Sequence, residues 1–571
     1  DPLHTPGHTR DAFDVWTQIT HNGDTKAAWA AAKQEQGKWE AAPVLVFDHK
    51  PQSIGSTIRR IVVNKRQDRD ILDDTIEAIR TVNAAQNSNP ILYARAGILS
   101  QVATDENGNH FIRNAEGAVL SSILVHAVDW VKQYRDKTGE IYLDDTSIPE
   151  RIVKMLEVPT GWAHVPPLEG IALAPVFAPD GALHDKLGYS PATRLYLAGS
   201  LGIGDTTPTE DNVARAKQLL TGELMGEFPF VDEASRAHAL ALLILPFVRP
   251  MIAGATPNHL IDAPTAGTGK SLLASLCTIP FAGGQKSTIS LTKSEDEFSK
   301  AIVTSLLSGR AFICIDNLPQ SAILDSSKLA SALTEKEIAD RTMRTHSAML
   351  IRPRAAWITT GNNTKLSVEL TRRTVHIRLD RNSETPWNTE GFKHADIQAW
   401  ATEHRAELAT AAITLVRNWI AKGKTKWTGK PKGSFSDWAQ VMGGILQSAD
   451  VGGFLENEAE MLETSAVGGN ELWRAFIDAW YTNHREMIVK VGELFKLASH
   501  PDRRGDGDDT PDPTEWLGLL DEELQGLPEA GRRRRFGRMM EERRDVVIGS
   551  YKLTRGKVRD GSSTWSLRKV G

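Results

Sequence analysis

The side chains of residues 260–276 are suited to binding a polyphosphate. This segment reads LIDAPTAGTGKSLLASL, in which an apolar stretch is followed by a glycine-rich turn and then by apolar residues at helical spacing. In such a strand–loop–helix arrangement, the backbone amides of the turn and the positive end of the helix dipole face the phosphates. Lys270 would reach the β- and γ-phosphates, and the Ser271 hydroxyl would ligate Mg²⁺. The pattern therefore predicts a P-loop.

The residues expected to contact the nucleotide form one continuous run. They are Pro264, Thr265, Ala266, Gly267, Thr268, Gly269, Lys270, Ser271 and Leu272. Proline stands where the G-x-x-x-x-G-K-S pattern usually has its first glycine, and proline has no amide hydrogen to donate. Position 264 lies upstream of the amides that would line the phosphates, so we expect the site to be intact. A glycine-rich turn before an ordinary core helix is the competing interpretation.

A second apolar segment ends in a carboxylate. Residues 311–317 read AFICIDN, which predicts a short buried strand whose Asp316 holds Mg²⁺ together with Ser271. We count Asn317 among the catalytic residues because its amide can orient a water molecule, although it cannot take a proton. The general base would then lie elsewhere, and the sequence does not rank the acidic candidates. These are Glu295, Glu297, Glu335 and Asp340.

Two amides and two guanidinium groups complete the set. Residues 357–363 read WITTGNN, a strand after which Asn362 or Asn363 would lie between the ends of the two earlier strands and contact the γ-phosphate or the attacking water. Arg372 and Arg373 precede another apolar strand, VHIRL. Guanidinium groups stay charged and bind phosphate in a bidentate manner, so either arginine would reach a γ-phosphate held by a neighbouring copy. A solvated surface pair is the alternative.

The chain of 571 residues is long enough for three or four domains, and its 40% hydrophobic and 24% charged residues are ordinary for a globular protein. The net charge of −5 argues against a surface that is basic throughout. The two cysteines, Cys277 and Cys314, lie in apolar segments and fit a reducing compartment. No apolar run is long enough to span a membrane, and the start, DPLHTPGHTR, has neither a signal-peptide pattern nor a Met. We expect a cytoplasmic protein, which this sequence represents in whole or in part.

Local patterns divide the chain into five expected regions. They are an α/β element over 1–90, an α+β domain over 91–225, a P-loop core over 226–390, a helical lid over 391–470 and a DNA-binding domain over 471–571. Apolar periodicity predicts helices over 70–83, 121–137 and 234–249. The sequence Asn107-Gly108-Asn109 predicts a hairpin turn.

The last part of the chain is basic and resembles a winged helix. Apolar periodicity predicts helices over 491–499, 516–523 and about 530–544, followed by a β-hairpin made from VVIGSYKLT and TWSLRKV. Over residues 530–571, thirteen Lys or Arg residues stand against four acidic ones. Cations of the third helix and of the hairpin loop would contact DNA. They are Arg532, Arg533, Arg534, Arg535, Arg538, Lys557 and Arg559. A solvated basic helix or an RNA-binding patch is the alternative.

A second basic segment lies between the AFICIDN and WITTGNN strands. It contains Lys336, Arg341, Arg352 and Arg354, with Arg344 and His346 near its middle. The last two are our candidates for the tip of a hairpin that follows a nucleic-acid backbone. An ordinary exposed loop would give the same pattern.

Together these segments resemble the AAA+ helicases of phages and integrated mobile elements, of the superfamily 3 or MCM-like kind often called primase-helicases. The resemblance is carried by FPFVDEASRAHALALLILPFVRP before LIDAPTAGTGKS, and then by ICIDN, ADRTMR, WITTGNN and LTRRTVHIRLD. FSDWAQVMGGILQSADVGGFLEN and FGRMMEERRDVVIGSYKL extend it, so that it covers roughly residues 90–571.

The resemblance implies a multi-domain α/β protein with an AAA+ core. It implies a homo-oligomeric ring, usually a hexamer, that hydrolyses ATP with Mg²⁺ to move along single-stranded DNA and open forks. By their places in the motifs, Lys270, Ser271, Asp316, Asn363 and Arg373 inherit the nucleotide roles. The partners would be single-stranded and forked DNA, further copies of the chain, and a primase or polymerase, in the cytoplasm of a bacterial host. The sequence shows no acidic triad of the kind that primases use, so we predict no primase activity.

Two other functions remain open. A DNA-bound AAA+ switch could recognise an origin or load another helicase without unwinding, which would suit Asn317 and the separate basic domain. A ring in a defence or packaging assembly could use ATP only to hold its subunits together.

Overall fold

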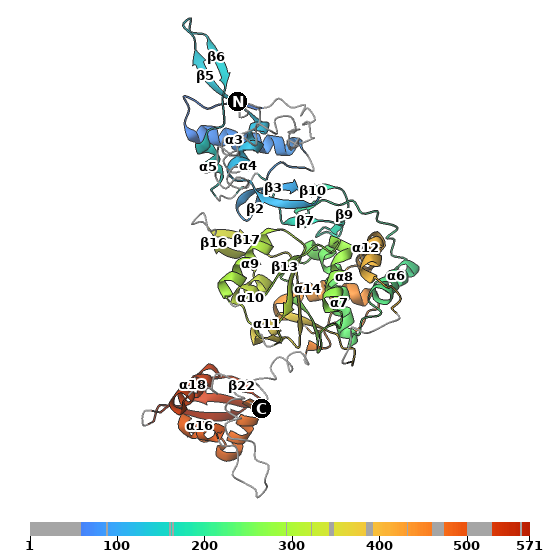
Figure 1. The fold of residues 1–571 in the computed structure, drawn as a ribbon, viewed down its shortest axis with the longest axis vertical. Coiled ribbons are helices and arrows are strands. Elements are labelled where there is room, and N and C mark those ends of the chain that lie inside the picture. Colours follow the sequence, from blue (N-terminus) through green and yellow to red (C-terminus); the bar gives the residue numbers. More distant parts are fainter. Residues whose placement is uncertain are drawn as a thin grey trace, which may run out of the picture. The chain divides into compact units, whose positions relative to one another are not determined.

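Figure 1 shows the computed structural model of the chain. It describes residues 59–86, 89–158, 162, 165–292, 294–320, 323–341, 348–383, 392–430, 432–458, 473–499, 528–559 and 562–570. From Arg60 onward these residues belong to one compact unit. Residues 1–58, and with them most of the element expected over 1–90, lie outside the described residues.

A five-stranded sheet forms the centre of the core, and every strand in it runs parallel to its neighbours. In spatial order the strands are β13 (Ser287–Ile289), β14 (Phe312–Leu318), β18 (Ala356–Asn362), β12 (Asn258–Ala263) and β20 (Thr374–Arg378). Nearly continuous burial along these strands is typical of a parallel sheet covered on both faces. Because all the strands are parallel, their carboxyl ends share one edge of the sheet. We call this the carboxyl edge and the opposite one the amino edge.

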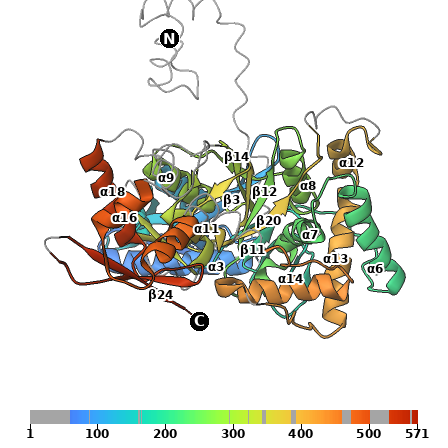
Figure 2. The same ribbon diagram turned by 90° about the horizontal axis from the view of Figure 1, so that it is seen from below.

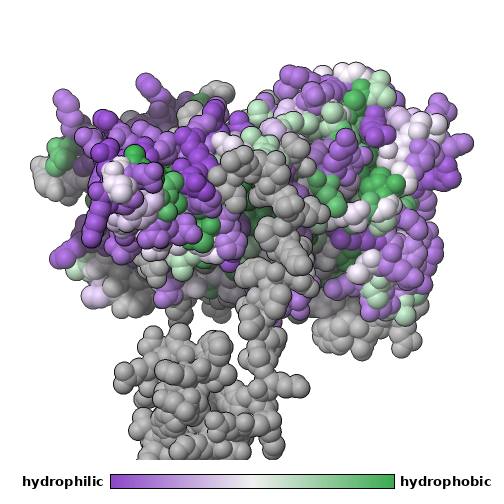
Figure 3. Space-filling model, turned by 90° about the horizontal axis from the view of Figure 1, so that it is seen from above, coloured by the Kyte–Doolittle hydropathy of each residue, from purple (hydrophilic) through white to green (hydrophobic). Residues whose placement is uncertain are grey.

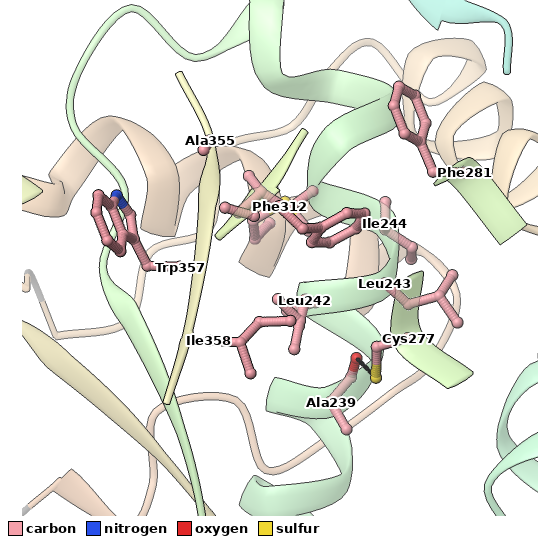
Figure 4. Packing of buried hydrophobic residues seen from close by; sticks show 14 of the residues in the cluster. Ala239, Leu242, Leu243, Ile244, Cys277, Phe281, Phe312, Ala355, Trp357 and Ile358 are labelled. Carbon is pink, nitrogen blue, oxygen red and sulfur yellow. Dashed lines mark hydrogen bonds between the residues drawn. The ribbon is translucent and has the colours of Figure 1, made fainter. Parts of the chain in front are cut away.

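Two apolar helices pack against the sheet and against each other. They are α7 (Glu233–Val248) and α8 (Lys270–Ala282). The first confirms the helix expected over 234–249, and it begins where the Asp232 carboxylate accepts a hydrogen bond from the Ser235 amide at 2.6 Å. Figure 4 shows Leu242 of α7 facing Ile358 of β18, with Cys277 of α8 beside them. A helix that is apolar on all sides must be buried, and α7 is.

Shorter elements surround this sheet. They are α9 (Glu295–Leu307), α10 (Ser327–Thr334), α11 (Val368–Thr371), η3 (Arg249–Met251), the parallel pair β15 (Ile323–Leu324) and β19 (Lys365–Leu366), and the antiparallel hairpin β16 (Ile338–Arg341) and β17 (Ala348–Ile351). The antiparallel pairing of β16 with β17 agrees with the hairpin expected in the second basic segment. Its connection, with Arg344 and His346, lies outside the described residues.

The helices expected as a lid pack beside the core. They are α12 (Ile397–Glu403), α13 (Arg405–Ala421), η5 (Gly433–Phe435) and α14 (Ser436–Ser448). Arg405 donates hydrogen bonds to the carbonyls of Ile279 (3.1 Å) and Phe281 (2.8 Å), which lie at the end of α8 opposite Lys270. Figure 2 shows α13 beside α6 (Glu210–Lys217), which is followed by the π-helical η2 (Gln218–Leu224). This packing supports the far end of α8.

The N-terminal part of the described chain forms a separate hydrophobic cluster. Its elements are β1 (Arg59–Val62), α3 (Asp68–Ala85), α4 (Gly117–Ala127), β5 (Val128–Arg135), β6 (Ile141–Asp145) and α5 (Glu150–Leu156). The helix expected over 121–137 is therefore wrong in its second half. Val128 and Trp130 are buried and Asp129 between them is exposed, a local period of two that fits the start of a strand. The boundary expected at residue 90 also runs through this cluster.

A β-rich segment follows. It contains the sheet β2 (Tyr93–Arg95), β3 (Ile98–Thr104) and β4 (His110–Asn114), the sheet β7 (Gly170–Ala172), β10 (Gly188–Ser190) and β11 (Leu195–Leu197), and the pair β8 (Val176–Phe177) and β9 (Leu183–His184). Gly108, at φ +80°, confirms the predicted turn between β3 and β4. Ala172 and Leu197 pack in the same hydrophobic cluster as the central sheet, so this segment is joined to the core.

The C-terminal residues form their own core around Trp480, Phe536 and Trp565. The elements are helical residues 473–484, β21 (Val489–Lys490), α16 (Val491–Ser499), α18 (Glu529–Glu542), β22 (Val547–Ile548), β23 (Tyr551–Arg555) and β24 (Thr564–Lys569). The first and third predicted helices are confirmed, and the second, over 516–523, lies outside the described residues. VVIGSYKLT is two strands and not one, because Gly549 at φ +60° makes a tight turn inside it.

No helix among the described residues has both the length and the apolar character of a membrane span. On the face drawn in Figure 3, hydrophilic residues predominate and hydrophobic ones form small separate patches.

Two buried histidines are expected to make the core sensitive to acid. Burial lowers the pKa of His238 to about 4 and that of His259 to about 3, while in an unfolded chain each is about 6.5. The folded state thus binds fewer protons, so its stability is full above pH 6.5 and falls as the pH drops toward 4, by about 1.4 kcal/mol per pH unit for each histidine. Urea unfolding followed by tryptophan fluorescence between pH 6.5 and 5 would measure this slope.

The hydrogen bonds of His238 suggest a control variant for this experiment. Its Nδ1 lies 2.8 Å from the His376 carbonyl, and its Nε2 accepts a hydrogen bond from the Leu455 amide at 3.1 Å, so a proton on Nε2 would break the second contact. His238→Gln keeps a donor and an acceptor but does not titrate, so its stability should fall less steeply. An unchanged slope would mean that His238 is not one of the groups responsible.

Candidate active site

The glycine-rich loop, residues 264–269, has the conformation that its sequence predicts. Gly267 and Gly269 have φ values of +78° and +97°, which favour glycine. The Thr265 carbonyl accepts hydrogen bonds from the Thr268 hydroxyl at 2.9 Å and from the Lys270 amine at 3.0 Å. The loop therefore closes on itself at the start of α8, with the lysine amine folded over it. This curl of backbone at a helix N-terminus fits a polyphosphate.

Two hydroxyls converge on the carboxylate at the end of β14. Ser271 Oγ lies 3.4 Å from Asp316 Oδ1, and Thr360 Oγ1 donates to the same oxygen at 2.5 Å. Thr360 Oγ1 in turn accepts a hydrogen bond from the Asn317 amide at 2.8 Å. Carboxylate and hydroxyl oxygens are the ligands that Mg²⁺ prefers, so Ser271 and Asp316 fit the predicted metal site. Sequence reasoning missed Thr360, whose only signal was its place in a polar strand end.

The strand that carries the amides lies between the two strands that carry Asp316 and the glycine-rich loop. This confirms the placement predicted for Asn362 and Asn363, since β18 pairs with β14 on one side and β12 on the other. Asn363 donates its backbone amide to the Ala263 carbonyl at 3.0 Å. The Oδ1 atom of Asn362 is buried and has no partner among the described residues. Both amides thus stand at the carboxyl edge beside the loop.

A buried ion pair ties Asn363 to the strand of the glycine-rich loop. Arg378 at the end of β20 binds the Asp262 carboxylate and donates a second hydrogen bond to Asn363 Oδ1 at 2.8 Å. Burial by itself would raise the pKa of Asp262. Nearby His376 (3.6 Å), the hydrogen bond from the Thr364 amide and the charge of Arg378 outweigh burial, so this pKa lies below its ordinary value. Sequence reasoning missed this pair, although the alternation in VHIRL placed His376 and Arg378 on one face.

The charge of Asp262 also affects the pKa of the Lys270 amine. Burial lowers the pKa of its amine, while the negative charge of Asp262 opposes that shift. The Asp262 carboxylate therefore helps to keep a cation at the loop.

The structure separates the four candidates for the general base. Glu295 and Glu297 lie in the first turn of α9, which follows β13 at the carboxyl edge beside Asp316. Glu295 Oε1 accepts a hydrogen bond from Ser326 Oγ at 2.7 Å. Glu335 lines a cavity at the amino edge, which places it away from the loop. The side chain of Asp340 lies outside the described residues.

Arg372 and Arg373 lie at the amino edge. The Arg373 carbonyl accepts a hydrogen bond from the amide of Asn258, the first residue of β12, whereas the glycine-rich loop follows the last residue of that strand. Glu369 holds the Arg373 guanidinium through a 3.1 Å ion pair. Arg372 is exposed and has no carboxylate partner within the described part of the chain. Neither can reach the loop of its own chain, so the predicted role requires a second copy.

The cations predicted to contact DNA in the C-terminal domain are partly exposed. Arg533, Arg534 and Arg538 are exposed on α18, and Lys557 and Arg559 are exposed between β23 and β24. Arg532 and Arg535 on the same helix are half-buried.

Arg378 is expected to be a positioning residue for the loop and for Asn363. For the ATP hydrolysis that the sequence predicts, Arg378→Gln should lower kcat about 10- to 100-fold, with a smaller change in KM, because Asp262 and Asn363 are no longer held together. The substitution also strands a buried carboxylate, which would cost about 3–5 kcal/mol of stability.

The double variant Asp262→Asn/Arg378→Gln separates the two effects. Removing the stranded charge should restore thermal stability while kcat stays low. If kcat returned together with stability, Arg378 would have only a structural role.

No protein-family model matches the chain, and no curated protein matches it. Among solved structures it is similar to the NrS-1 C-terminal region, with a TM-score of 0.33, 12% identity and coverage of 79% of this chain and 98% of that one. It is also similar to the SCCmec type IV Cch active helicase, with a TM-score of 0.31, 12% identity and coverage of 84% of this chain and 97% of that one. For the JCV helicase the TM-score is 0.19, the identity 13%, and the coverage 42% of this chain and 67% of that one. These TM-scores are too low for the likenesses to identify the function of this chain.

Proposed function

We propose that this chain is an ATP-dependent DNA helicase, an AAA+ ring translocase of the superfamily 3 or MCM-like kind that replicates a phage or mobile genetic element. The observation that supports it best is the cluster of Ser271, Asp316 and Thr360 beside Lys270. Three neighbouring parallel strands bring these groups to one edge, next to a glycine-rich loop at a helix N-terminus.

Each group has a role that follows from its chemistry. The loop amides and Lys270 bind the phosphates of ATP, and Ser271 and Asp316 hold Mg²⁺, which neutralises phosphate charge when bound. Asn317 and Asn363 orient the attacking water through hydrogen bonds. Glu295 and Glu297 are the candidates for accepting its proton, because they start α9 at the same edge.

The site needs a second copy of the chain. Arg372 and Arg373 lie at the opposite edge of the sheet from Lys270, so a finger arginine must come from a neighbour in a homo-oligomeric ring, which we propose to be a hexamer. Its partners would be single-stranded and forked DNA, bound in part by the basic C-terminal domain, and a primase or polymerase of the same replication system.

Unwinding of a forked duplex tests this proposal. Purified protein with Mg²⁺ and ATP should separate a labelled fork, and the same protein with a non-hydrolysable ATP analogue should not. Robust ATPase activity with no unwinding on forks of either polarity would contradict the helicase proposal.

A DNA-bound AAA+ switch, which recognises an origin or loads a helicase, is the second candidate. Asn317 favours it, since an amide follows Asp316 where a carboxylate could accept a proton, and the residue adopts a left-handed conformation at φ +55°. Substituting Arg533 and Arg534 should then abolish binding to one specific duplex sequence. A helicase would instead lose affinity for all sequences alike.

A further inference from the structure

Two adjoining cavities lie at the amino edge of the sheet, on the side away from the glycine-rich loop. Their volumes are about 50 and 400 Å³, and Arg249, Arg352, Arg354 and Ala355 line both. The larger one is also lined by Trp357, which Figure 4 shows pointing to the side of β18 opposite Ile358. Nothing in the nucleotide chemistry of the carboxyl edge uses these residues.

The cavities are strongly basic. The charged residues that line the smaller one are Arg95, Arg249, Arg310, Arg352, Arg354 and Glu169. Five guanidinium groups thus surround one carboxylate. The larger cavity adds Lys336, with Glu335 and Glu337, so it also has an excess of positive charge.

Two of these arginines are buried and bind carbonyl groups, with no ion pair to a carboxylate in the described part of the chain. Arg249 is 8% exposed and donates to the carbonyls of Ile252 (2.8 Å) and Pro353 (3.4 Å), and its Nε atom is buried without a partner there. Arg95 is 9% exposed, donates to carbonyls, and likewise has a buried Nε without a partner among these residues. Burial lowers the pKa of Arg249 to about 9 and that of Arg95 to about 10, so both remain charged at neutral pH. Buried cations of this kind are costly unless an anion approaches them.

Glu169 supplies too little negative charge for its neighbours. Its carboxylate accepts contacts from Arg354 at 2.8 Å, Arg194 at 3.4 Å and Arg352 at 3.5 Å. Arg352 also pairs with Glu337 at 2.9 Å, so two carboxylates face these three guanidinium groups. One positive charge stays unbalanced, and phosphate oxygens bind the same planar donors. A phosphate could therefore replace Glu169 as the partner of Arg352 and Arg354.

We propose that these cavities bind consecutive backbone phosphates of a single DNA strand. The cations come from separate elements and line two adjoining cavities, whereas a lone phosphate would need only one or two of them. Lys336 precedes β16 and Arg352 follows β17, so these two cations flank the strand pair whose connection holds the predicted DNA-contacting residues. The inference rests on the proposed action on DNA, and it adds the site where the strand is held.

Two substitutions with opposite expected effects test this. Affinity of the full chain for a fluorescent oligo(dT) strand is measured without nucleotide over a range of salt concentrations. The double variant Arg352→Gln/Arg354→Gln should bind about tenfold more weakly, and its salt slope should fall by about 0.7 for each phosphate that the variant no longer binds. Glu169→Gln should instead bind several-fold more tightly, because the competing carboxylate is gone. Arg80→Gln, which removes an exposed arginine that lines neither cavity, is the matched control and should match the wild type.

The outcomes decide between distinct explanations. If both the Arg352/Arg354 and the Glu169 variants weaken binding, the cluster is a structural ion-pair network, and if neither changes it, the strand binds elsewhere; either result overturns the inference. Displacement of the strand by inorganic pyrophosphate at comparable concentration would show a small-anion site instead. Fork unwinding by the wild type is scored separately. If the cavity variants bind the strand like the wild type but the wild type unwinds forks, only the inference is wrong. If the variants change binding as expected but no fork is unwound, only the proposed helicase function is wrong.

Discussion

Replacing Lys270 with alanine is expected to lower kcat for ATP hydrolysis about 100- to 1,000-fold, because the loop loses the cation that its own chain holds over it. The amine lies 3.0 Å from the Thr265 carbonyl, so it is already in place at the mouth of the loop. Phosphate release from ATP at saturating Mg²⁺ measures the change. Fork unwinding should disappear in parallel.

Lys286→Ala is the matched control. Lys286 donates to Ser275 Oγ at 3.2 Å and stands outside the glycine-rich loop, so it should leave kcat within about twofold. Both variants should keep the wild-type melting temperature, since Lys270 is half-buried and its hydrogen bond within the described chain goes to a carbonyl. Full ATPase activity in Lys270→Ala would mean that hydrolysis occurs at another site or not through this loop.

Mixing two inactive variants is expected to restore ATPase activity. The double variant Arg372→Ala/Arg373→Ala should hydrolyse ATP about 1,000-fold more slowly, as loss of an arginine finger does elsewhere. Lys270→Ala is inactive for the opposite reason, since it keeps the finger but lacks the lysine. In a randomly mixed ring about one interface in four combines the intact loop of one copy with the intact arginines of the next.

This result follows from where the residues lie in the sheet. The glycine-rich loop follows the last residue of β12, and Arg373 contacts the first, so one chain cannot bring both to one phosphate. Recovery of activity on mixing would show that sites form between copies. If the arginine variant alone were fully active, neither residue would be the finger, and if mixing gave nothing, the loss would come from the fold of each variant. Testing Arg372→Ala and Arg373→Ala singly then identifies the finger, since Glu369 holds only the second.

Local signals were enough to predict the loop and the strand ends. Glycines at 267 and 269 and the apolar runs around Asp316 and Asn363 are each readable within a few neighbouring residues. Neighbouring residues in the sequence do not predict which side chains these residues contact in the fold. Thr360 meets Asp316 only because β18 lies next to β14, and a strand order is set by packing across the sheet, not by adjacent residues.

The helix expected over 121–137 failed for a related reason. Residues 121–127 are helical, and the apolar residues continue into Val128 and Trp130 without a glycine or proline to mark the end. What ends the helix is the pairing of β5 with distant strands, β1 earlier in the chain and, over residues 131–135, β6 later in it. The ion pair of Asp262 and Arg378 was missed on the same grounds, because its two members lie far apart in the sequence and meet across neighbouring strands.

The insertion of β18 between β12 and β14 bears on how the molecule is made. During synthesis, β12 and β14 leave the ribosome before β18 does. In the folded sheet β12 and β14 are not neighbours, because β18 lies between them and pairs with both. Contacts so distant along the chain form slowly. A truncated chain that stops short of β18 would leave the edges of β12 and β14 unpaired, and it should aggregate and not fold into a smaller domain.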